Sequence, residues 1–208
     1  MGHKMSVISR QLDKNKKLID KVEKIASMVE IHDSNQKAML FGAFLQDATS
    51  HYHAMNILIE KKLYNSAFAL VRVFFDAIVR GQYAIYICDD AKINEMYSIQ
   101  KDWQFPKTKE ICPALDAHFR IDIFEKTRAS SYGMMCDYAH IGQNQIARHF
   151  DESKATIEPN FDDSLMVDTL QGNYTLMEMF AKNFIDYMQA EKLLDSEVNL
   201  MYCSHNSC

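Results

Sequence analysis

The spacing of apolar residues near the start of the chain predicts a long amphipathic helix. Between residues 5 and 29, apolar side chains recur at helical spacing: Met5, Ile8, Leu12, Ile19, Val22, Ala26 and Val29. This spacing puts them on one face of a helix, and only Asn15 interrupts the seam. Such a face packs against other helices of a bundle or against a second copy of the chain.

Helical patterns also fill the next part of the chain. Polar residues at 32–34 predict the N-cap of a second helix that ends near Lys61. A third helix is expected over about 63–87 and a shorter fourth over about 89–100. The third helix has no polar face wide enough for a surface helix, which predicts a central place in the bundle.

Proline and glycine mark the predicted breaks in the second half of the chain. The segment 103–113 holds two of the three prolines and predicts a loop. A helical pattern resumes near Ala114, breaks near Asp122 and ends before Gly142, which fits the left-handed residue that follows many helices. Three further elements are predicted: a short helix at 143–150, a turn at 158–163 and a final helix capped by Asp162 or Asp163.

Composition agrees with an all-α fold. The 208 residues include six glycines and three prolines, too few for the many turns of a sheet protein. With 48% hydrophobic and 25% charged residues, the chain falls in the range of globular domains. We therefore expect one all-α domain over residues 1–208, a bundle of about five to seven helices. Residues 1–5 are interpreted as a vector-derived start and residues 197–208 as a flexible tail.

The sequence lacks the marks of a membrane protein or of a disulfide-bonded one. No charged segment followed by an apolar one opens the chain, and no apolar run approaches the roughly 18 residues that span a bilayer. The five cysteines are scattered and form no C-x-x-C pair, which favours reduced thiols over a zinc site or disulfides. We expect a cytoplasmic protein with no cofactor and no bound metal.

Charge is distributed unevenly along the chain. The net charge of −5 argues against a protein that coats nucleic acid in general. Residues 1–24, however, hold seven Lys or Arg against three Asp or Glu. A basic first helix can contact phosphates electrostatically, and a solvated helix face is the alternative interpretation.

Two opposite charges interrupt the most apolar stretch of the chain. Between Ala67 and Val79, every residue is apolar except Arg72 and Asp76. Arg80 continues the same spacing of four, so the three charged side chains share one face of the third helix. Because burying an unpaired charge is costly, these charges either pair to fix the helix register or line a cavity.

A second polar segment, DYAHIGQNQIARH, follows in the second half of the chain. It places His140 near a helix end and Arg148 eight residues later. A histidine beside arginines has the groups needed for proton transfer and phosphate binding. A cluster that opens into a positively charged cleft would favour a phosphate ligand, whereas a sealed cluster would favour a structural role.

The stretches LYNSAFALVRVFFDAIVRGQYAIY, YAHIGQNQIARHF and IEPNFDD resemble an uncharacterised bacterial family of all-helical proteins. Members typically show an SAFALVRPxFEAxVRG helix and a YTHGGxxQxxRR segment. Three positions depart from this pattern, since Val73 replaces proline, Asp76 replaces glutamate and Ile141 replaces the first glycine after the histidine. The family's polar positions fall on Arg72, Asp76, Arg80, His140, Arg148 and, in the preceding helix, His53.

This family is similar to the HEPN helical bundles, many of which are metal-independent ribonucleases of toxin–antitoxin and phage-defence systems. The resemblance implies an HEPN-like fold, a homodimer, RNA as the substrate and a protein antitoxin or other partner. In these roles His140 is the general acid or base, Arg72 and Arg148 bind phosphate, and Asp76 orients an arginine. Arg80 and His53 complete the implied substrate site. The compact arginine–histidine signature of those ribonucleases is not found in this sequence.

Two other interpretations stay open at this point. The first is a non-enzymatic interaction module, in which Arg72, Asp76 and His140 form a structural network and the bundle surface binds a protein. The second is a metal site, since helical bundles build such sites from carboxylates and histidines. The paired Glu-x-x-His motifs of di-iron proteins are absent, and central arginines would repel a cation. The candidate metal ligands are Asp47, His51, His53, Asp76 and His140.

Overall fold

The computed structural model describes residues 6–31, 35–97, 104–147, 149–151, 156–157 and 161–200. These residues form eight helices, one above the expected range, and one pair of short antiparallel strands, so the all-α class is confirmed. The helices are α1 (Val7–Ala26), α2 (Gln36–Glu60), α3 (Tyr64–Tyr86), α4 (Asp90–Tyr97), α5 (Thr108–Phe119), α6 (Ile123–Ala139), α7 (Gln143–Ala147) and α8 (Asp163–Ala190). The strands are β1 (Phe150–Asp151) and β2 (Thr156–Ile157).

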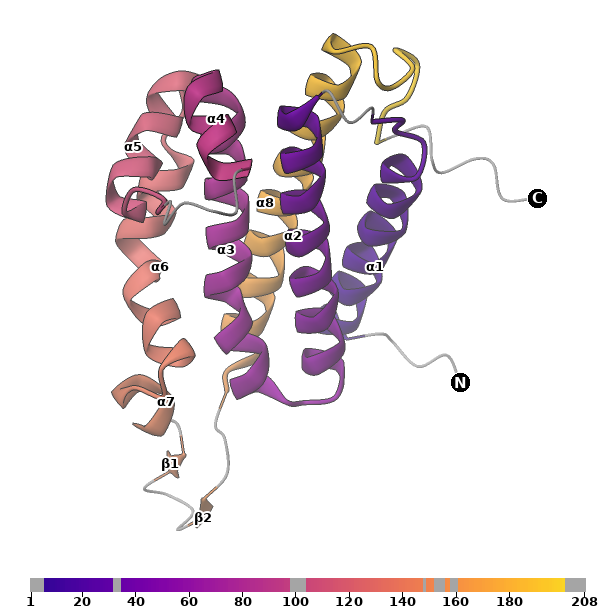
Figure 1. Ribbon diagram of the computed structural model, residues 1–208. Coiled ribbons are helices and arrows are strands. Elements are labelled where there is room, and N and C mark those ends of the chain that lie inside the picture. Colours follow the sequence, from indigo (N-terminus) through magenta and orange to yellow (C-terminus); the bar gives the residue numbers. More distant parts are fainter. Residues whose placement is uncertain are drawn as a thin grey trace, which may run out of the picture.

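The hairpin of α2 and α3 forms the centre of the bundle (Figure 1). Helices α1 and α8 pack against α2, and α8 also contacts α3. Helices α5 and α6 pack against α3 and against each other. The short helix α7 and the two strands lie at the end of the bundle where α6 ends (Figure 1). The predicted central position of the third helix is therefore confirmed.

An aromatic cluster joins α2, α3 and α8 in the core of the bundle. The ring of Phe41 on α2 is fully buried. Its centroid lies 5.4 to 6.1 Å from four other rings, mostly with their edges toward it, an arrangement that adds attraction beyond the buried area. The four partners are Tyr86, Phe180, Phe184 and Tyr187. Helices α2, α3 and α8 are thus held together by one set of ring contacts.

Asn15, the single polar residue of the first apolar seam, is completely buried. Its Nδ2 donates to Oδ1 of Asn56 on α2 over 2.7 Å, and its Oδ1 accepts from Nε2 of Gln11 over 2.9 Å. Asn56 in turn donates to the carbonyl oxygen of Tyr52. Because a buried amide needs such partners, this chain of hydrogen bonds fixes the position of α1 along α2.

The loop predicted over 103–113 is only partly correct. Residues 104–107 are not helical, but α5 begins at Thr108 and includes Pro113, six residues before the expected start at Ala114. A proline inside a helix costs about 3 kcal/mol. Burying one large apolar side chain gains about 1.5–3 kcal/mol, and α5 buries Ile111 and Leu115 completely. The free energy gained by burying these side chains therefore exceeds the cost of Pro113 inside the helix.

The break predicted near Asp122 is confirmed. Arg120 ends α5 in the left-handed conformation with φ 57°, and α6 starts after Asp122. The carboxylate of Asp116 on α5 accepts hydrogen bonds from the backbone N–H groups of Phe124 and Glu125, at 3.0 and 2.8 Å. Since these N–H groups have no partner inside α6, Asp116 caps that helix from its neighbour. This short connection between α5 and α6 determines how α6 packs against α3.

The observed starts of α2 and α8 agree in part with those predicted from the sequence. Residues 32–34 lie outside the described residues, and the N-cap of α2 is Asn35, whose side chain accepts from the N–H of Ala38 over 2.9 Å. Asp162 stands at the N-cap of α8, as expected. Residues 1–5, 158–160 and 201–208 are also outside the described residues. None of the described helices is long and apolar enough to cross a bilayer.

Candidate functional site

Arg72, Asp76 and Arg80 share one face of α3, as their spacing predicted. Oδ2 of Asp76 lies 3.8 Å from Nε of Arg72 and 3.8 Å from a terminal nitrogen of Arg80. Asp76 is buried, whereas the side chains of Arg72 and Arg80 remain 26% and 40% exposed. The carboxylate therefore lies beneath two guanidinium groups that reach the surface.

Helices α5 and α6 bring two hydroxyl groups to the same carboxylate. The hydroxyl of Tyr132 donates to Oδ1 of Asp76 over 3.1 Å. Oγ1 of Thr108 lies 3.4 Å from the same oxygen and 3.2 Å from the Tyr132 hydroxyl. Hydrogen bonds to a charged acceptor are stronger than neutral ones. Asp76 thus connects α3, α5 and α6 at one point.

An open groove of about 440 Å³ lies where these three helices meet. Five of the side chains that line it are cationic, and none is acidic. The Arg80 guanidinium lies over the ring of Phe105 at 5.4 Å, and that of Arg72 lies over Tyr132 at 5.7 Å. These contacts hold both arginines at the edge of the groove. The lining residues are Arg72, Arg80, Phe105, Pro106, Lys107, Thr108, Lys109, Arg128 and Tyr132.

The cations of the groove are only partly neutralised. Arg72 and Arg80 share Asp76, and Arg128 makes two hydrogen bonds, of 2.5 and 2.6 Å, to the Glu125 carboxylate. Arg128 also lowers the pKa of Glu125 through these bonds, so this carboxylate stays ionised. Neither lysine of the groove forms an ion pair with the described residues. Positive charge is therefore in excess.

The start of α5 adds a further positive element to this groove. Lys107 occupies the N-cap position and Thr108 begins the helix, and both line the groove. The N-cap side chain makes no hydrogen bond to the backbone of the first turn. The N-terminus of a helix carries partial positive charge and N–H groups without a partner inside the helix. An anion in the groove can therefore use backbone donors as well as side chains.

Several neighbours act on the pKa of Arg72. Burial has the largest single effect and lowers this pKa, but Tyr132, Cys136 and Asp76 together raise it above the ordinary value. The guanidinium is therefore charged at every pH at which the protein folds.

His140 is the histidine that the structure brings to this cluster. It is exposed at the C-cap of α6, and its Nε2 lies 2.5 Å from a terminal nitrogen of Arg72. Because a guanidinium can only donate, Nε2 must accept and carries no proton. The imidazole in this contact is therefore neutral, with its proton on Nδ1. The structure thus brings His140 into contact with Arg72.

The backbone after His140 differs from the prediction. The left-handed residue is Ile141, with φ 55°, and Gly142 has an ordinary negative φ. The N–H of Gly142 donates to the carbonyl of Asp137 over 2.7 Å, which closes the helix one residue earlier than expected. A Cβ on Gly142 would overlap the Asp137 carboxylate. A side chain at position 142 would therefore require the Asp137 carboxylate to move.

We expect the change Ile141→Gly to raise the free energy of unfolding by about 1 kcal/mol. A left-handed conformation is unfavourable for a β-branched residue, and the Ile141 side chain is 70% exposed, so its removal loses little packing. Urea denaturation measures the change. Ile146, 47% exposed on the neighbouring α7, is the matched control, and Ile146→Gly should lower stability. Equal losses for both variants would contradict the prediction.

Of two further expected site residues, His53 makes no described contact with this cluster, and Arg148 lies outside the described residues. His53 is exposed on α2, as its periodicity predicted. No hydrogen bond or ion pair between described residues joins it to Arg72, Asp76 or His140. Arg148 lies outside the described residues, so its role as a phosphate ligand stays a prediction. Its neighbour His149 contacts Asn65 at the start of α3 over 2.9 Å.

Three of the five cations that line the groove, together with Tyr132, were not predicted from the sequence. Lys107 and Lys109 stood in a segment interpreted as a loop, and Arg128 and Tyr132 had no spacing that related them to α3. The pattern K-T-K at a helix start was the one local signal available, because basic residues beside free N–H groups favour anions. No pattern in the sequence predicted that α6 would approach Asp76.

The described residues offer no alternative centre built on a metal ion. Among them, no group of three or more histidine, cysteine, aspartate or glutamate side chains is placed to hold one. Asp76, the carboxylate of the cluster, is instead surrounded by donors from Arg72, Arg80, Thr108 and Tyr132. These donors favour an anion over a cation in the groove.

Comparison with known proteins places most of the chain in one family. Residues 46–208 match the model of a family described as "Family of unknown function (DUF6988)". The match starts inside α2 and includes α3, α5 and α6, which build the groove. The comparisons with curated proteins and with solved structures gave no match.

Proposed function

Since the chain belongs to the DUF6988 family, whose description names no activity, we propose a function from the site itself. The groove between α3, α5 and α6 binds the phosphate backbone of RNA. His140 then acts as the general acid or base of a metal-independent cleavage reaction. The observation that carries this proposal is the set of five cations in one groove, joined to His140 through Arg72.

The composition of the groove supports phosphate as the ligand. Arginine presents a planar fork of donors to two phosphate oxygens, and lysine supplies a mobile point charge. The groove contains both types, together with the N-terminus of α5. The chain as a whole carries a net charge of −5, so this concentration of cations does not follow from overall composition.

The contact between Arg72 and His140 supports a role in proton transfer. A phosphate oxygen is a charged acceptor and competes with the neutral imidazole for the N–H groups of Arg72. Binding of a phosphate at Arg72 would release Nε2 of His140, which could then take the proton of a ribose 2′-hydroxyl. The 2′-oxygen attacks phosphorus to form a cyclic phosphate, and the bond from phosphorus to the 5′-oxygen breaks. The 5′-oxygen takes a proton from water, and Arg72 and Arg80 stabilise the charge on the phosphate.

Binding to unpaired RNA should depend strongly on salt. If all five cations contact phosphates, the logarithm of the binding constant should fall with the logarithm of salt concentration with a slope of about −3.5. We expect the double change Lys107→Ala and Lys109→Ala to reduce this slope by about 1.4. Fluorescence anisotropy with a labelled oligonucleotide at several salt concentrations measures the slope.

The matched control removes two lysines from α1, Lys14 and Lys17, which are exposed and do not line the groove. This pair changes the net charge equally and should leave the slope unchanged. If the α1 pair lowers the slope and the groove pair does not, RNA binds the basic first helix and the proposal is wrong.

A second function is favoured by one observation. Asp76 is 8% exposed and is bonded to groups from three helices, as expected of a structural network in a non-enzymatic interaction module. The two arginines above it reach an open groove, which favours the phosphate site. If the unmodified chain is folded and binds no RNA, the interaction module is favoured. The homodimer, the antitoxin partner, the HEPN-like relationship and the role in phage defence stay predictions.

A further inference from the structure

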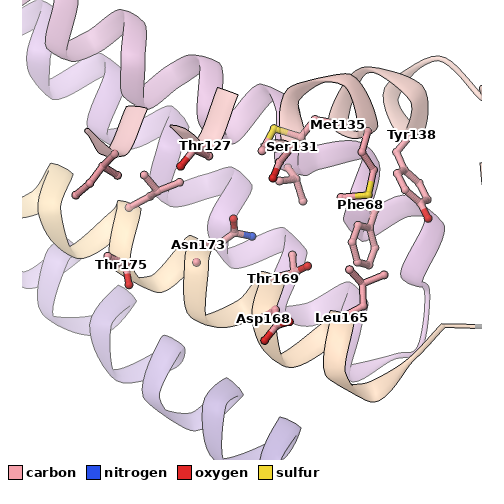
Figure 2. Close-up of a pocket in the computed structure, with 15 residues that line it drawn as sticks. Phe68, Thr127, Ser131, Met135, Tyr138, Leu165, Asp168, Thr169, Asn173 and Thr175 are labelled. Atoms are coloured by element: carbon pink, nitrogen blue, oxygen red, sulfur yellow. The ribbon is translucent and has the colours of Figure 1, made fainter. Parts of the chain in front are cut away.

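A second pocket lies between α6 and α8 (Figure 2), and it shares no lining residue with the basic groove. Both helices pack against α3, and Phe68 and Val71 of α3 belong to its lining. Its volume is about 390 Å³, within the range of about 300–1,000 Å³ for sites that hold small molecules. The proposed RNA site uses none of its residues.

The pocket is long and narrow. Its lining runs along α6 from Ile123 to Tyr138 and along α8 from Leu165 to Leu176. At 1.5 Å per residue, the shorter wall measures about 16 Å. A helix of this length with its side chains, about 10 Å across, would occupy roughly 1,200 Å³ and would lie mostly outside the pocket. An extended chain fits this shape better than a helical peptide.

The interior surface of the pocket is mostly apolar. Methionine side chains adapt to irregular ligands, and two of them, Met134 and Met135, line the α6 wall. One buried polar group interrupts this surface. Asn173 is 6% exposed and donates to the thioether sulfur of Met55, a weak acceptor, at 3.7 Å. Figure 2 shows Asn173 and Thr169 on the same wall as Asp168.

The rim of the pocket carries negative charge. Asp168 is exposed and is the single charged residue among those that line the pocket. It also lines an adjoining groove together with Asp163. Neither carboxylate forms an ion pair with the described residues. An apolar interior with an acidic rim is complementary to a molecule with an apolar chain and a cationic end.

We propose that the pocket between α6 and α8 binds an organic cation with an aliphatic chain. The chain lies along the apolar walls between Phe68 and Leu176, and the cationic group lies beside Asp168. The hydroxyl and amide groups of Thr169 and Asn173 accept the remaining hydrogen bonds of the head group.

Displacement of a fluorescent probe tests this assignment. N-phenyl-1-naphthylamine, which is neutral and apolar, is bound to the full chain and displaced by alkylammonium ions of increasing length. Affinity should increase about fourfold for each added methylene, until the chain is longer than the pocket. Affinity that does not depend on chain length would overturn the proposal.

Two glycines provide a matched pair of variants. A Cβ added at Gly172 in α8 or at Gly133 in α6 would meet no atom of a neighbouring residue within 4 Å, but only Gly172 lines the pocket. Both substitutions by leucine should favour the helix to a similar extent. Gly172→Leu should weaken alkylammonium binding by about tenfold or more, and Gly133→Leu should not. Equal binding by both variants would show general adsorption and overturn the proposal.

The cationic head group is tested separately. The change Asp168→Asn should weaken binding of decylammonium by about two- to fivefold and leave that of decanol unchanged, because an exposed charge pair has a modest effect. Binding of decanol that equals that of decylammonium, with no response to Asp168→Asn, would overturn the assignment of a cationic ligand. These readouts do not involve RNA, so they are independent of the proposed cleavage.

Discussion

The change His140→Ala is expected to lower the rate of RNA cleavage in the presence of chelator by about 10²- to 10⁴-fold, the usual contribution of a general acid or base. The physical reason is the position of Nε2, which the phosphate ligand would release from Arg72 and leave next to the reacting ribose. The measurement is the initial rate of cleavage of a labelled RNA, followed on a gel. RNA affinity should change little, because His140 does not line the groove.

A second histidine provides the control for this experiment. His53 is also exposed on a helix, but it has no contact with the Arg72 cluster among the described residues. His53→Ala should leave the rate unchanged if His140 alone transfers the proton. A circular dichroism spectrum must show that both variants keep their helices. Cleavage that survives His140→Ala would remove His140 from the mechanism, whereas a loss in both variants would restore the substrate-binding role expected for His53.

The change Asp76→Ala is expected to lower the free energy of unfolding by about 2–3 kcal/mol. Removing one member of a fully buried ion pair costs about 3–5 kcal/mol, and the value here should be smaller because Arg72 and Arg80 are partly exposed. The substitution also leaves the hydroxyl of Tyr132 without its charged acceptor. Urea denaturation, followed by circular dichroism, measures the loss.

The variant Asp76→Asn separates charge from hydrogen bonding. Asparagine keeps an acceptor for Tyr132 at nearly the same place and removes only the negative charge beneath the two arginines. We expect it to lose about half as much stability as Asp76→Ala, in the range of about 1–1.5 kcal/mol. If both variants unfold like the unmodified chain, Asp76 does not connect the three helices in the way the geometry indicates.

The helical part of the fold was largely predictable from the chain. The apolar repeats gave the positions of α1, α2, α3 and α8, because a helix buries one face and this requirement repeats along the sequence. The break near Asp122 was also predicted correctly. The start of α5 was wrong, because the prolines of segment 103–113 have a local cost that the burial of Ile111 and Leu115 outweighs.

The candidate site was also predicted only in part. The spacing of four placed Arg72, Asp76 and Arg80 on one face, and helix periodicity alone determines such a result. The association of His140 with Arg72 was predicted from a resemblance and from the chemistry of the two side chains. Lys107, Lys109 and Arg128 were missed, because they join the site through the approach of other helices.

By itself, the sequence determined that this protein is an all-helical bundle whose third helix carries three charged residues on one face. These properties depend on neighbours three or four residues apart, which the order of residues specifies directly. Only the tertiary structure decided that the charges face an open groove, because α5 and α6 approach α3 through contacts between residues far apart in the chain. The pocket between α6 and α8 has the same origin, since two helices that pack on α3 leave a space that neither helix encodes alone.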